Sequence, residues 1–248
     1  MAAKNAIELR NVSKAFGPKK VLDGFDLAIK EGESVVLLGQ SGMGKSVALR
    51  LILGLMGADG GTVRVRGADV SGYSEREFYQ SNRKIGMLFQ NGALFDSMSV
   101  WENVAFALLN VEKMDAGRAR DVALKKLAEV GLDAKVADMA PAELSGGMKK
   151  RVGLARAIAN DPEIVFFDEP TTGLDPIMGD VINNLIVRCV KSLGATALTI
   201  THDIASAKKI ADRVVMLYQG KIVWNGRPAE LAHPGNDYVA RFVKGVSA

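Results

Sequence analysis

Residues 39–46 read Gly-Gln-Ser-Gly-Met-Gly-Lys-Ser, a complete match to the phosphate-binding pattern G-x-x-x-x-G-K-[ST]. An apolar run at 35–38 precedes this stretch and predicts a buried strand. Apolar residues at helical spacing follow it: Val47, Ala48, Leu51, Ile52 and Leu55. A phosphate-binding loop requires this order of strand, loop and helix. The alternative, a glycine-rich turn that matches by chance, does not account for the flanking pattern.

The residue types in the loop suit a phosphate ligand. Glycines let backbone N–H groups turn toward phosphate oxygens, and the positive end of the following helix faces the same anion. The Lys45 ammonium supplies charge for the β- and γ-phosphates, and the Ser46 hydroxyl is a hard oxygen ligand for Mg²⁺. We therefore predict that a nucleoside triphosphate binds to the loop through Gly39, Ser41, Gly42, Gly44, Lys45 and Ser46.

Two carboxylates follow a second apolar run. Residues 164–167 read Ile-Val-Phe-Phe, which fits a strand buried on both faces, and Asp168 and Glu169 come directly after it. Because ligands of open α/β sheets lie beyond the carboxyl ends of the strands, both side chains are expected to face the loop. Asp168 is then placed to hold Mg²⁺, and Glu169 is the candidate general base for the attacking water. The alternative is a strand that ends in a solvated acidic turn.

A short glycine-rich run identifies a family. Residues 144–148 read Leu-Ser-Gly-Gly-Met. With the loop upstream and the carboxylates downstream, this run resembles the signature of ATP-binding-cassette (ABC) ATPases, and the resemblance covers essentially the whole chain. It implies an α/β P-loop NTPase of ABC type, with a mixed sheet core, an antiparallel β subdomain and a helical lobe. It also implies ATP hydrolysis with ATP and Mg²⁺ as cofactors.

The resemblance implies roles for further residues. Phe16 matches the aromatic residue that stacks on adenine, Gln90 the glutamine that joins Mg²⁺ to the transporter-facing loop, and His202 the histidine that senses the γ-phosphate. Asp175 matches the loop that follows the second carboxylate motif. Nucleotide bound by an opposite subunit would contact Ser145, Gly146 and Gly147. The chain departs from the family at Met148, usually glutamine, and at Phe16, usually tyrosine, and neither change removes a phosphate ligand.

Two positions have competing interpretations. His202 comes after a predicted sheet strand at 196–200 and is expected at the same sheet edge as Asp168, although an ordinary surface histidine is the alternative. The Lys-Lys-Arg run at 149–151 should lie in the first turns of a helix, where positive charge is unfavourable. These side chains either point into solvent or surround the γ-phosphate of an opposite subunit. Because the chain carries one cassette, the resemblance implies a homodimer with two shared ATP sites.

Composition narrows the class of protein. A single cysteine, Cys189, excludes a disulfide framework, and the apolar helical pattern around it predicts a buried thiol. Residues 1–4 lack the apolar core of a signal peptide, and no apolar run approaches the roughly 18 residues that span a bilayer. The net charge of +4 is diffuse, with no basic arm interleaved with aromatics, so nucleic acid is not an expected partner.

Periodicity predicts the organisation of the chain. Alternating residues predict antiparallel strands at 5–10 and 62–67, and further strands are expected at 213–218 and 221–224. The predicted ranges are a RecA-like nucleotide-binding core with its antiparallel β subdomain at 1–91 and 159–227, a helical lobe with the signature at 92–158, and a C-terminal tail at 228–248.

ATP hydrolysis by this chain could serve three functions: that of a transport ATPase, of a soluble cassette ATPase of DNA repair or translation, or of a regulatory switch. The sequence lacks the long insertions or second cassette of the soluble enzymes, and a switch would be expected to lack Glu169. Transport is favoured. Residues 92–96, 100–104 and 171–178 and the methionine-containing signature resemble the ATPases of Mla/Mce lipid-transport systems. That resemblance implies phospholipid transport between the inner and outer membranes of Gram-negative bacteria, and the alternative is an importer of another small solute such as an amino acid.

The same resemblance implies partners and a location. Permease subunits would dock near Gln90–Trp101, and a periplasmic lipid-binding Mce-type subunit would complete the complex. The chain itself would lie on the cytoplasmic face of the bacterial inner membrane as a peripheral protein. An apolar cluster is then expected to line a docking cleft for a permease helix, and its residues are Ala93, Leu94, Phe95 and Trp101. The alternative places Leu94 and Phe95 in the core of the helical lobe.

Overall fold

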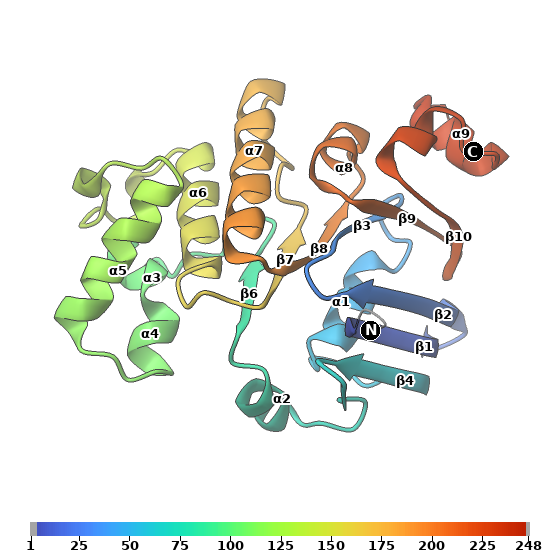
Figure 1. The fold of residues 1–248 in the computed structure, drawn as a ribbon, viewed down its shortest axis with the longest axis horizontal. Helices are drawn as coiled ribbons and strands as arrows, with labels where there is room; N and C mark the ends of the chain where they lie inside the picture. Colours follow the sequence, from blue (N-terminus) through green and yellow to red (C-terminus); the bar gives the residue numbers. More distant parts are fainter. Residues whose placement is uncertain (1–3, 247–248) are drawn as a thin grey trace. The chain divides into compact units, whose positions relative to one another are not determined.

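The computed structural model describes residues 4–246, and the chain packs as two compact units (Figure 1). The first unit contains the residues up to 83 and those from 196 onward, and the second contains residues 84–195. The division into core, helical lobe and tail stays a prediction, and the ends of its ranges, 1–3 and 247–248, lie outside the described residues, as does most of the N-terminal run at 1–4. Within the described part of the chain, no helix is long and apolar enough to cross a membrane.

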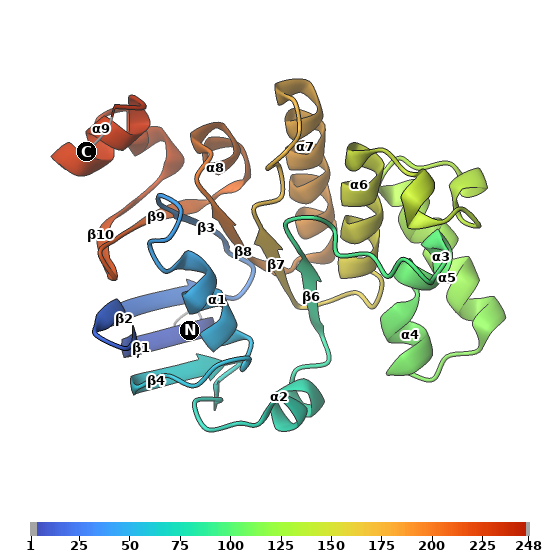
Figure 2. The ribbon, with the colours of Figure 1, turned by 180° about the vertical axis from the view of Figure 1, so that it is seen from behind.

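The first unit contains an antiparallel sheet. Its strands, in the order β2-β1-β4-β5, are β2 (Lys19–Lys30), β1 (Asn5–Phe16), β4 (Gly60–Val65) and β5 (Ala68–Asp69). Ile7 of β1 lies opposite Val65 of β4, which confirms the predicted antiparallel pairing of these segments. Helix α1 (Lys45–Ile52) lies beside this sheet in Figure 2, and α2 (Glu75–Ser81) belongs to the same unit.

A second group of strands in this unit has β3 (Ser34–Leu38) at its centre, and every residue of β3 is buried, as a two-sided strand requires. It pairs in parallel with β8 (Thr196–Thr201) and β9 (Arg213–Tyr218), and β9 pairs antiparallel with β10 (Lys221–Gly226). Helix α8 (Ile204–Ile210) follows β8.

The predicted helix after the loop is shorter than its periodicity suggested. The helical spacing of apolar residues predicts Leu55 on the apolar face of this helix, but α1 ends at Ile52 and the Leu55 side chain is 52% exposed. Gly54 has a φ of 66°, which takes the chain out of the helix before Leu55 is reached. The apolar pattern therefore continued past the true end of the helix.

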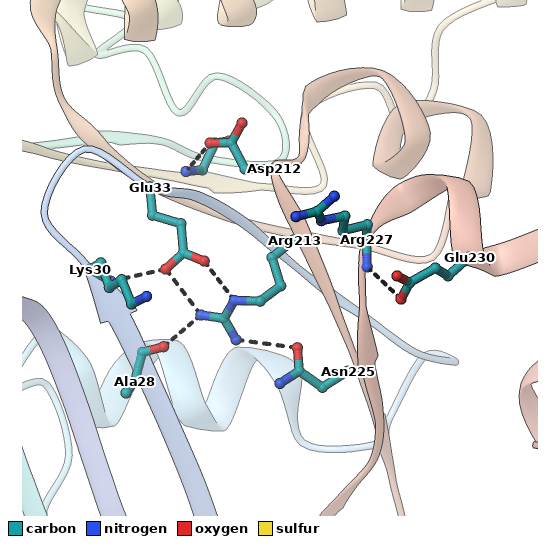
Figure 3. Close-up of polar contacts among 9 residues, drawn as sticks. Ala28, Lys30, Glu33, Asp212, Arg213, Asn225, Arg227 and Glu230 are labelled. Atoms are coloured by element: carbon teal, nitrogen blue, oxygen red, sulfur yellow. Dashed lines mark hydrogen bonds and ion pairs between the residues drawn. The ribbon is translucent and has the colours of Figure 1, made fainter. Parts of the chain in front are cut away.

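An arginine ties several strand ends together in the first unit (Figure 3). Arg213, the first residue of β9, donates from Nε to Glu33 at 2.6 Å and from its terminal nitrogens to the Ala28 carbonyl at 2.6 Å and the Asn225 side chain at 3.3 Å. Burial raises the pKa of Glu33, but hydrogen bonds from Arg213 and the Lys30 N–H outweigh it, and the net pKa is lowered. This ion pair fixes the start of β3 against β2, β9 and β10.

The C-terminal segment packs on the same unit rather than trailing away. It contains a 3-10 turn, η3 (Pro228–Ala232), and a helix, α9 (Asp237–Val243), whose Leu231 and Val239 are fully buried. The Trp224 indole N–H donates to the Pro234 carbonyl at 2.9 Å, and the Tyr218 and Tyr238 rings lie 3.9 Å apart. These contacts fold the predicted tail onto β9 and β10.

The second unit combines two parallel strands with a group of helices. The strands are β6 (Ile85–Leu88) and β7 (Ile164–Asp168), and the helices are α3 (Val100–Val104), α4 (Phe106–Asn110), α5 (Ala116–Glu129), α6 (Gly146–Ala157) and α7 (Pro176–Leu193), with 3-10 turns η1 (Ala134–Val136) and η2 (Pro141–Glu143). Figures 1 and 2 show α6 between α5 and α7. Cys189 lies buried on α7, as predicted, and burial raises the pKa of its thiol.

Candidate functional site

The glycine-rich loop joins β3 to α1 in the first unit, the strand–loop–helix order that the sequence predicted. Gly44 immediately precedes α1 with a φ of 101°, and a Cβ built on it would lie 2.9 Å from the Val21 carbonyl oxygen. Gly39 has a Cβ position only 2.7 Å from the Leu217 carbonyl oxygen. Any larger residue at either place would move the loop, so the glycines keep backbone N–H groups within reach of an anion.

Lys45 and Ser46 begin α1, where the first N–H groups of a helix have no intrahelical acceptor. The Lys45 ammonium donates to the Gly39 carbonyl at 2.5 Å and to the Gln40 carbonyl at 3.0 Å, so it spans the loop from within. The Ser46 hydroxyl is exposed. The Lys45 charge and the N-terminus of α1 therefore both lie at the loop, as a phosphate site needs.

His202 directly follows β8, whose Thr201 lies opposite Leu38 of β3. Because β3 and β8 are parallel neighbours, His202 and the start of the loop leave the sheet at the same edge. The His202 side chain is exposed, and Asp203 beside it caps α8 by accepting from the Ala205 and Ser206 N–H groups. Phe16 ends β1 with an exposed ring, and the Lys14 ammonium lies 5.8 Å from its centre.

The two predicted catalytic carboxylates lie at the end of β7 in the second unit. Asp168 is the last residue of the strand, and Glu169 follows with a φ of 46°, in the left-handed region that non-glycine residues rarely adopt. The Glu169 carboxylate accepts from the Thr172 hydroxyl at 3.0 Å, and its carbonyl accepts from the Thr172 N–H at 3.2 Å. A strained backbone and a fixed carboxylate are features that recur at active sites.

The signature run forms the start of α6. The Ser145 hydroxyl caps the helix by accepting from the Met148 N–H at 3.3 Å. Gly147 is buried, and a Cβ on it would lie 2.8 Å from the Met178 methyl carbon, whereas the Cβ position of Gly146 is open. Asp175 caps α7 in the same way, by accepting from the Ile177 and Met178 N–H groups.

Gln90 comes two residues after β6, and its side chain is exposed. The segment that follows is held from beneath by Asn103, a fully buried side chain of α3. Its amide accepts from the Phe95 N–H at 2.7 Å, and its nitrogen lies 3.0 to 3.2 Å from the carbonyls of Phe95, Met98 and Ser99. The Phe95 ring is 43% exposed and packs on Phe106, with ring centres 4.6 Å apart. The core alternative for Phe95 is therefore wrong.

Comparisons with known proteins identify the family of the chain. The family model described as "ABC transporter" matches residues 22–172, more than half of the chain. This chain belongs to that family. A protein of Haemophilus influenzae, the intermembrane phospholipid transport system ATP-binding protein MlaF, is 38% identical over 98% of this chain and 92% of its own.

Two further relatives and one solved structure are also similar to this chain over most of its length. The chloroplast protein TRIGALACTOSYLDIACYLGLYCEROL 3 of Arabidopsis thaliana is 42% identical over 96% of this chain and 73% of its own length. The probable ribonucleotide transport ATP-binding protein mkl of Mycobacterium tuberculosis is 38% identical over 97% of this chain and 67% of its own. The structure of a dimeric ATP-binding cassette, MJ0796, in a post-hydrolysis state with ADP and Pi, has a TM-score of 0.82 and 33% identity, and covers 90% of this chain and 98% of that one.

Membership of the ABC transporter family makes this chain an ATP-binding transport ATPase with the P-loop fold of ABC type. The candidate residues divide between its two units. The loop, Phe16 and His202 belong to the first unit, and the second unit holds Gln90, the signature run, the two carboxylates and Asp175.

The structure contradicts one of the two interpretations of the basic run at 149–151, in which all three side chains point into solvent. Lys150 does not point into solvent, since it is only 5% exposed. Burial lowers the pKa of its ammonium, while the charges of Asp168 and Glu169 oppose that shift. Arg151 donates to the Gly131 carbonyl at 3.3 Å. The γ-phosphate interpretation of the run stays a prediction.

Two side chains that support candidate site residues were not predicted from the sequence. The Thr172 hydroxyl donates to the Glu169 carboxylate. This contact could have been predicted, because a hydroxyl three positions after the candidate base can reach it within one turn of the chain. Asn103 gave no such signal, because an asparagine inside a helical pattern is usually a solvated side chain.

Proposed function

We propose that this ABC ATPase powers the movement of phospholipid between the inner and outer membranes of a Gram-negative bacterium. The observation that carries the proposal is the match to the phospholipid-transport protein MlaF of H. influenzae, which extends over nearly the full length of both chains. A second relative is named for a galactolipid, trigalactosyldiacylglycerol. The chain would work as a peripheral protein on the cytoplasmic face of the inner membrane, with permease subunits and a periplasmic Mce-type lipid-binding subunit.

A second cargo class has an observation in its favour. The mycobacterial relatives are named as probable ribonucleotide transport proteins, and their identity to this chain, 38%, equals that of MlaF from H. influenzae. We favour phospholipid because two of the relatives are named for lipids. Transport of ribonucleotide, or of another small solute such as an amino acid, is the alternative that the experiment on cargo must exclude.

The ATP phosphates would bind to the loop in the first unit. The Lys45 ammonium neutralises the β- and γ-phosphates, the loop N–H groups donate to their oxygens, and the exposed Phe16 ring offers a stacking surface for adenine. His202, which leaves the sheet beside the loop, would hydrogen-bond the γ-phosphate. In the opposite subunit, Ser145, Gly146 and Gly147 would close over the same nucleotide, with Asp175 beside them.

The residues present also fit Mg²⁺. Ser46, Gln90 and Asp168 offer hydroxyl, amide and carboxylate oxygens, the hard donors that this ion prefers, and the Ser46 and Gln90 side chains are exposed. Among residues 4–246, no group of three or more His, Cys, Asp or Glu side chains is placed to hold a metal. Protein Mg²⁺ sites commonly take one or two carboxylates and complete the shell with water and phosphate. When bound, the ion would neutralise charge that develops on the phosphates.

Glu169 would act as the general base. Its carboxylate, held by Thr172, accepts a proton from the attacking water as that water bonds to the γ-phosphorus and the bond to ADP breaks. Replacing Glu169 by glutamine keeps the shape but removes the proton acceptor, so ATP binding should persist while turnover falls on the order of a hundredfold or more. Lys45→Ala should instead abolish binding. Near-normal hydrolysis by Glu169→Gln contradicts the assignment.

The two ATP sites are proposed to be shared between two copies of the chain, an arrangement supported by the dimeric state of MJ0796. Mixing Lys45→Ala chains with Ser145→Arg chains leaves one composite site intact and damages the other twice. ATP-dependent pairing should therefore return in the mixture, although neither variant pairs alone. If Glu169→Gln remains monomeric in saturating Mg-ATP, with or without permease, the shared-site model is wrong.

The cargo is tested on the native complex. A tagged copy of this chain is used to purify the assembly from membranes in mild detergent, and mass spectrometry identifies the permease, any Mce-type subunit and the small molecules that copurify. The complex is then reconstituted, and ATP hydrolysis is measured with added phospholipid, ribonucleotide or amino acid, with Glu169→Gln as the inactive control. Enrichment of phospholipid and stimulation by phospholipid support the proposal. Stimulation by a ribonucleotide or amino acid alone overturns it.

A further inference from the structure

Helix α6 carries a buried cation that touches two parts of the second unit at once. The Lys150 ammonium donates to the carbonyl oxygen of Gln90, and it lies 3.2 Å from the carbonyl oxygen of Glu169. Both acceptors are main-chain atoms. Lys150 therefore does not neutralise a partner side chain directly, and its contacts fix the path of the backbone at two places.

One of those two places, Glu169, is conformationally strained. Glu169 has a φ of 46°, a conformation that residues other than glycine, asparagine and aspartate rarely adopt. Such a residue keeps its conformation only when surrounding groups hold it there. The Glu169 carbonyl receives contacts from Lys150 and from the Thr172 N–H at 3.2 Å. Loss of the ammonium would release one of them and allow the peptide after Glu169 to rotate.

The other place is Gln90, which lies in the segment after β6. Side chains of α6 bond to several carbonyls of this segment. Arg156 donates to the Gly92 carbonyl at 2.6 Å and to the Ala93 carbonyl at 2.8 Å. Gly153 allows the close approach, because a Cβ there would lie 2.8 Å from the Leu88 side chain. Lys150 adds the contact at Gln90. The segment from Gln90 to Ala93 is therefore attached to α6 through its main-chain carbonyls.

We propose that Lys150 is a positioning residue for hydrolysis, which fixes the backbone of Glu169 relative to that of Gln90. Through it, a displacement of the segment that carries Phe95 reaches the candidate general base without a change in the nucleotide contacts. The inference rests on the proposed role of Glu169. Both of its acceptors are main-chain carbonyls, so we assign it to positioning rather than to catalysis.

The chain offers a matched control. Lys126 is a second buried lysine of the same unit, but its ammonium bonds carboxylates, with Asp161 at 2.7 Å and Glu129 at 3.5 Å. Lys126→Met removes a buried charge without touching the backbone of either Gln90 or Glu169. It reports the cost of losing a buried lysine, whereas Lys150→Met reports that cost together with any loss of positioning.

The test measures kcat and KM for ATP, ATP binding and melting temperature on the assembled transporter complex. Lys150→Met should lower kcat by about tenfold or more, because small displacements of a catalytic group are costly, while the Kd for ATP changes less than about twofold. Lys150→Arg, which keeps a charged donor, should recover most of kcat. Lys126→Met should lower the melting temperature and leave kcat unchanged.

A double variant separates positioning from general damage. If Lys150 acts through Glu169, then Lys150→Met should not lower the residual kcat of Glu169→Gln any further, since the two effects are not additive. Wild-type kcat in folded Lys150→Met, failure of Lys150→Arg to recover activity, or additive losses in the double variant each overturn the inference. Should Lys150→Met fail to fold, Lys150→Gln takes its place, and a folded Gln variant with wild-type kcat overturns it equally.

Failure of this inference is distinguishable from failure of the proposed function. An inactive Glu169→Gln beside a fully active Lys150→Met removes the positioning role and leaves the general base in place. An active Glu169→Gln removes the general base, whatever Lys150 does.

Discussion

Asn103 supports the surface that is proposed to meet the permease, and its removal should have a measurable cost. The side chain is fully buried, its oxygen accepts from the Phe95 N–H, and its nitrogen faces three carbonyls between residues 95 and 99. An amide of this kind makes one accepted and two donated hydrogen bonds. At about 1 kcal/mol each, Asn103→Ala should destabilise the protein by about 3 kcal/mol.

The expected shift of the melting temperature follows from chain length. For a protein of this size, about 1 kcal/mol corresponds to roughly 2–4 °C, so Asn103→Ala should melt about 6–12 °C lower in a calorimetric or circular-dichroism scan. The control is Asn110→Ala, because Asn110 is exposed and its amide donates only to the Phe106 carbonyl at 3.0 Å. Its effect should stay within about 0.5 kcal/mol. Equal melting temperatures for the two variants would refute the supporting role of Asn103.

Three other predictions use separate features. Phe95→Asp should leave the melting temperature within about 2 °C of wild type, because the ring is 43% exposed, yet weaken permease copurification and transport; unchanged copurification contradicts the docking role. Gly44→Ala should abolish ATP binding in a titration, since its Cβ would meet the Val21 carbonyl at a φ of 101°, and retained affinity would show that the loop can relax. Because the pKa of Glu33 beside Arg213 is lowered from 4.5, its charge stabilises the fold above that pH and stops doing so as the pH falls through the lowered value. The difference in urea midpoint between wild type and Glu33→Gln should therefore be full at pH 7 and shrink in acid, and a constant difference contradicts the ion pair.

The parts of this molecule that the sequence predicted are those encoded over short distances. The loop at 39–46, its strand and the start of its helix lie within one continuous stretch, and the helix that follows the signature run is encoded in the same local way. Strand β2 was missed, although Phe25, Leu27 and Ile29 alternate with polar or small residues as they should in a half-buried strand. The helix end was misplaced because periodicity alone does not report the conformation of a glycine.

The remaining features depend on contacts between distant residues. Lys150 reaches the carbonyl of a residue 60 positions earlier, and nothing in either neighbourhood distinguishes it from a solvated lysine. A backbone carbonyl has no identity in the sequence, so its acceptor role appears only once the fold brings a donor to it. The conformation of Glu169 is hidden for the same reason, because any residue type can be forced into the left-handed region by its surroundings.

The division into two compact units places one tryptophan in each. The chain has two tryptophans in all, with Trp101 in the second unit beneath the Arg120 guanidinium and Trp224 in the first, where its indole N–H is bonded to the Pro234 carbonyl. Replacing either one by phenylalanine leaves a single intrinsic fluorophore. The emission of Trp224 then reports release of the C-terminal segment, and quenching of Trp101 by iodide reports exposure of the helical unit. The chain thus carries its own pair of optical probes, with no dye and no added cysteine.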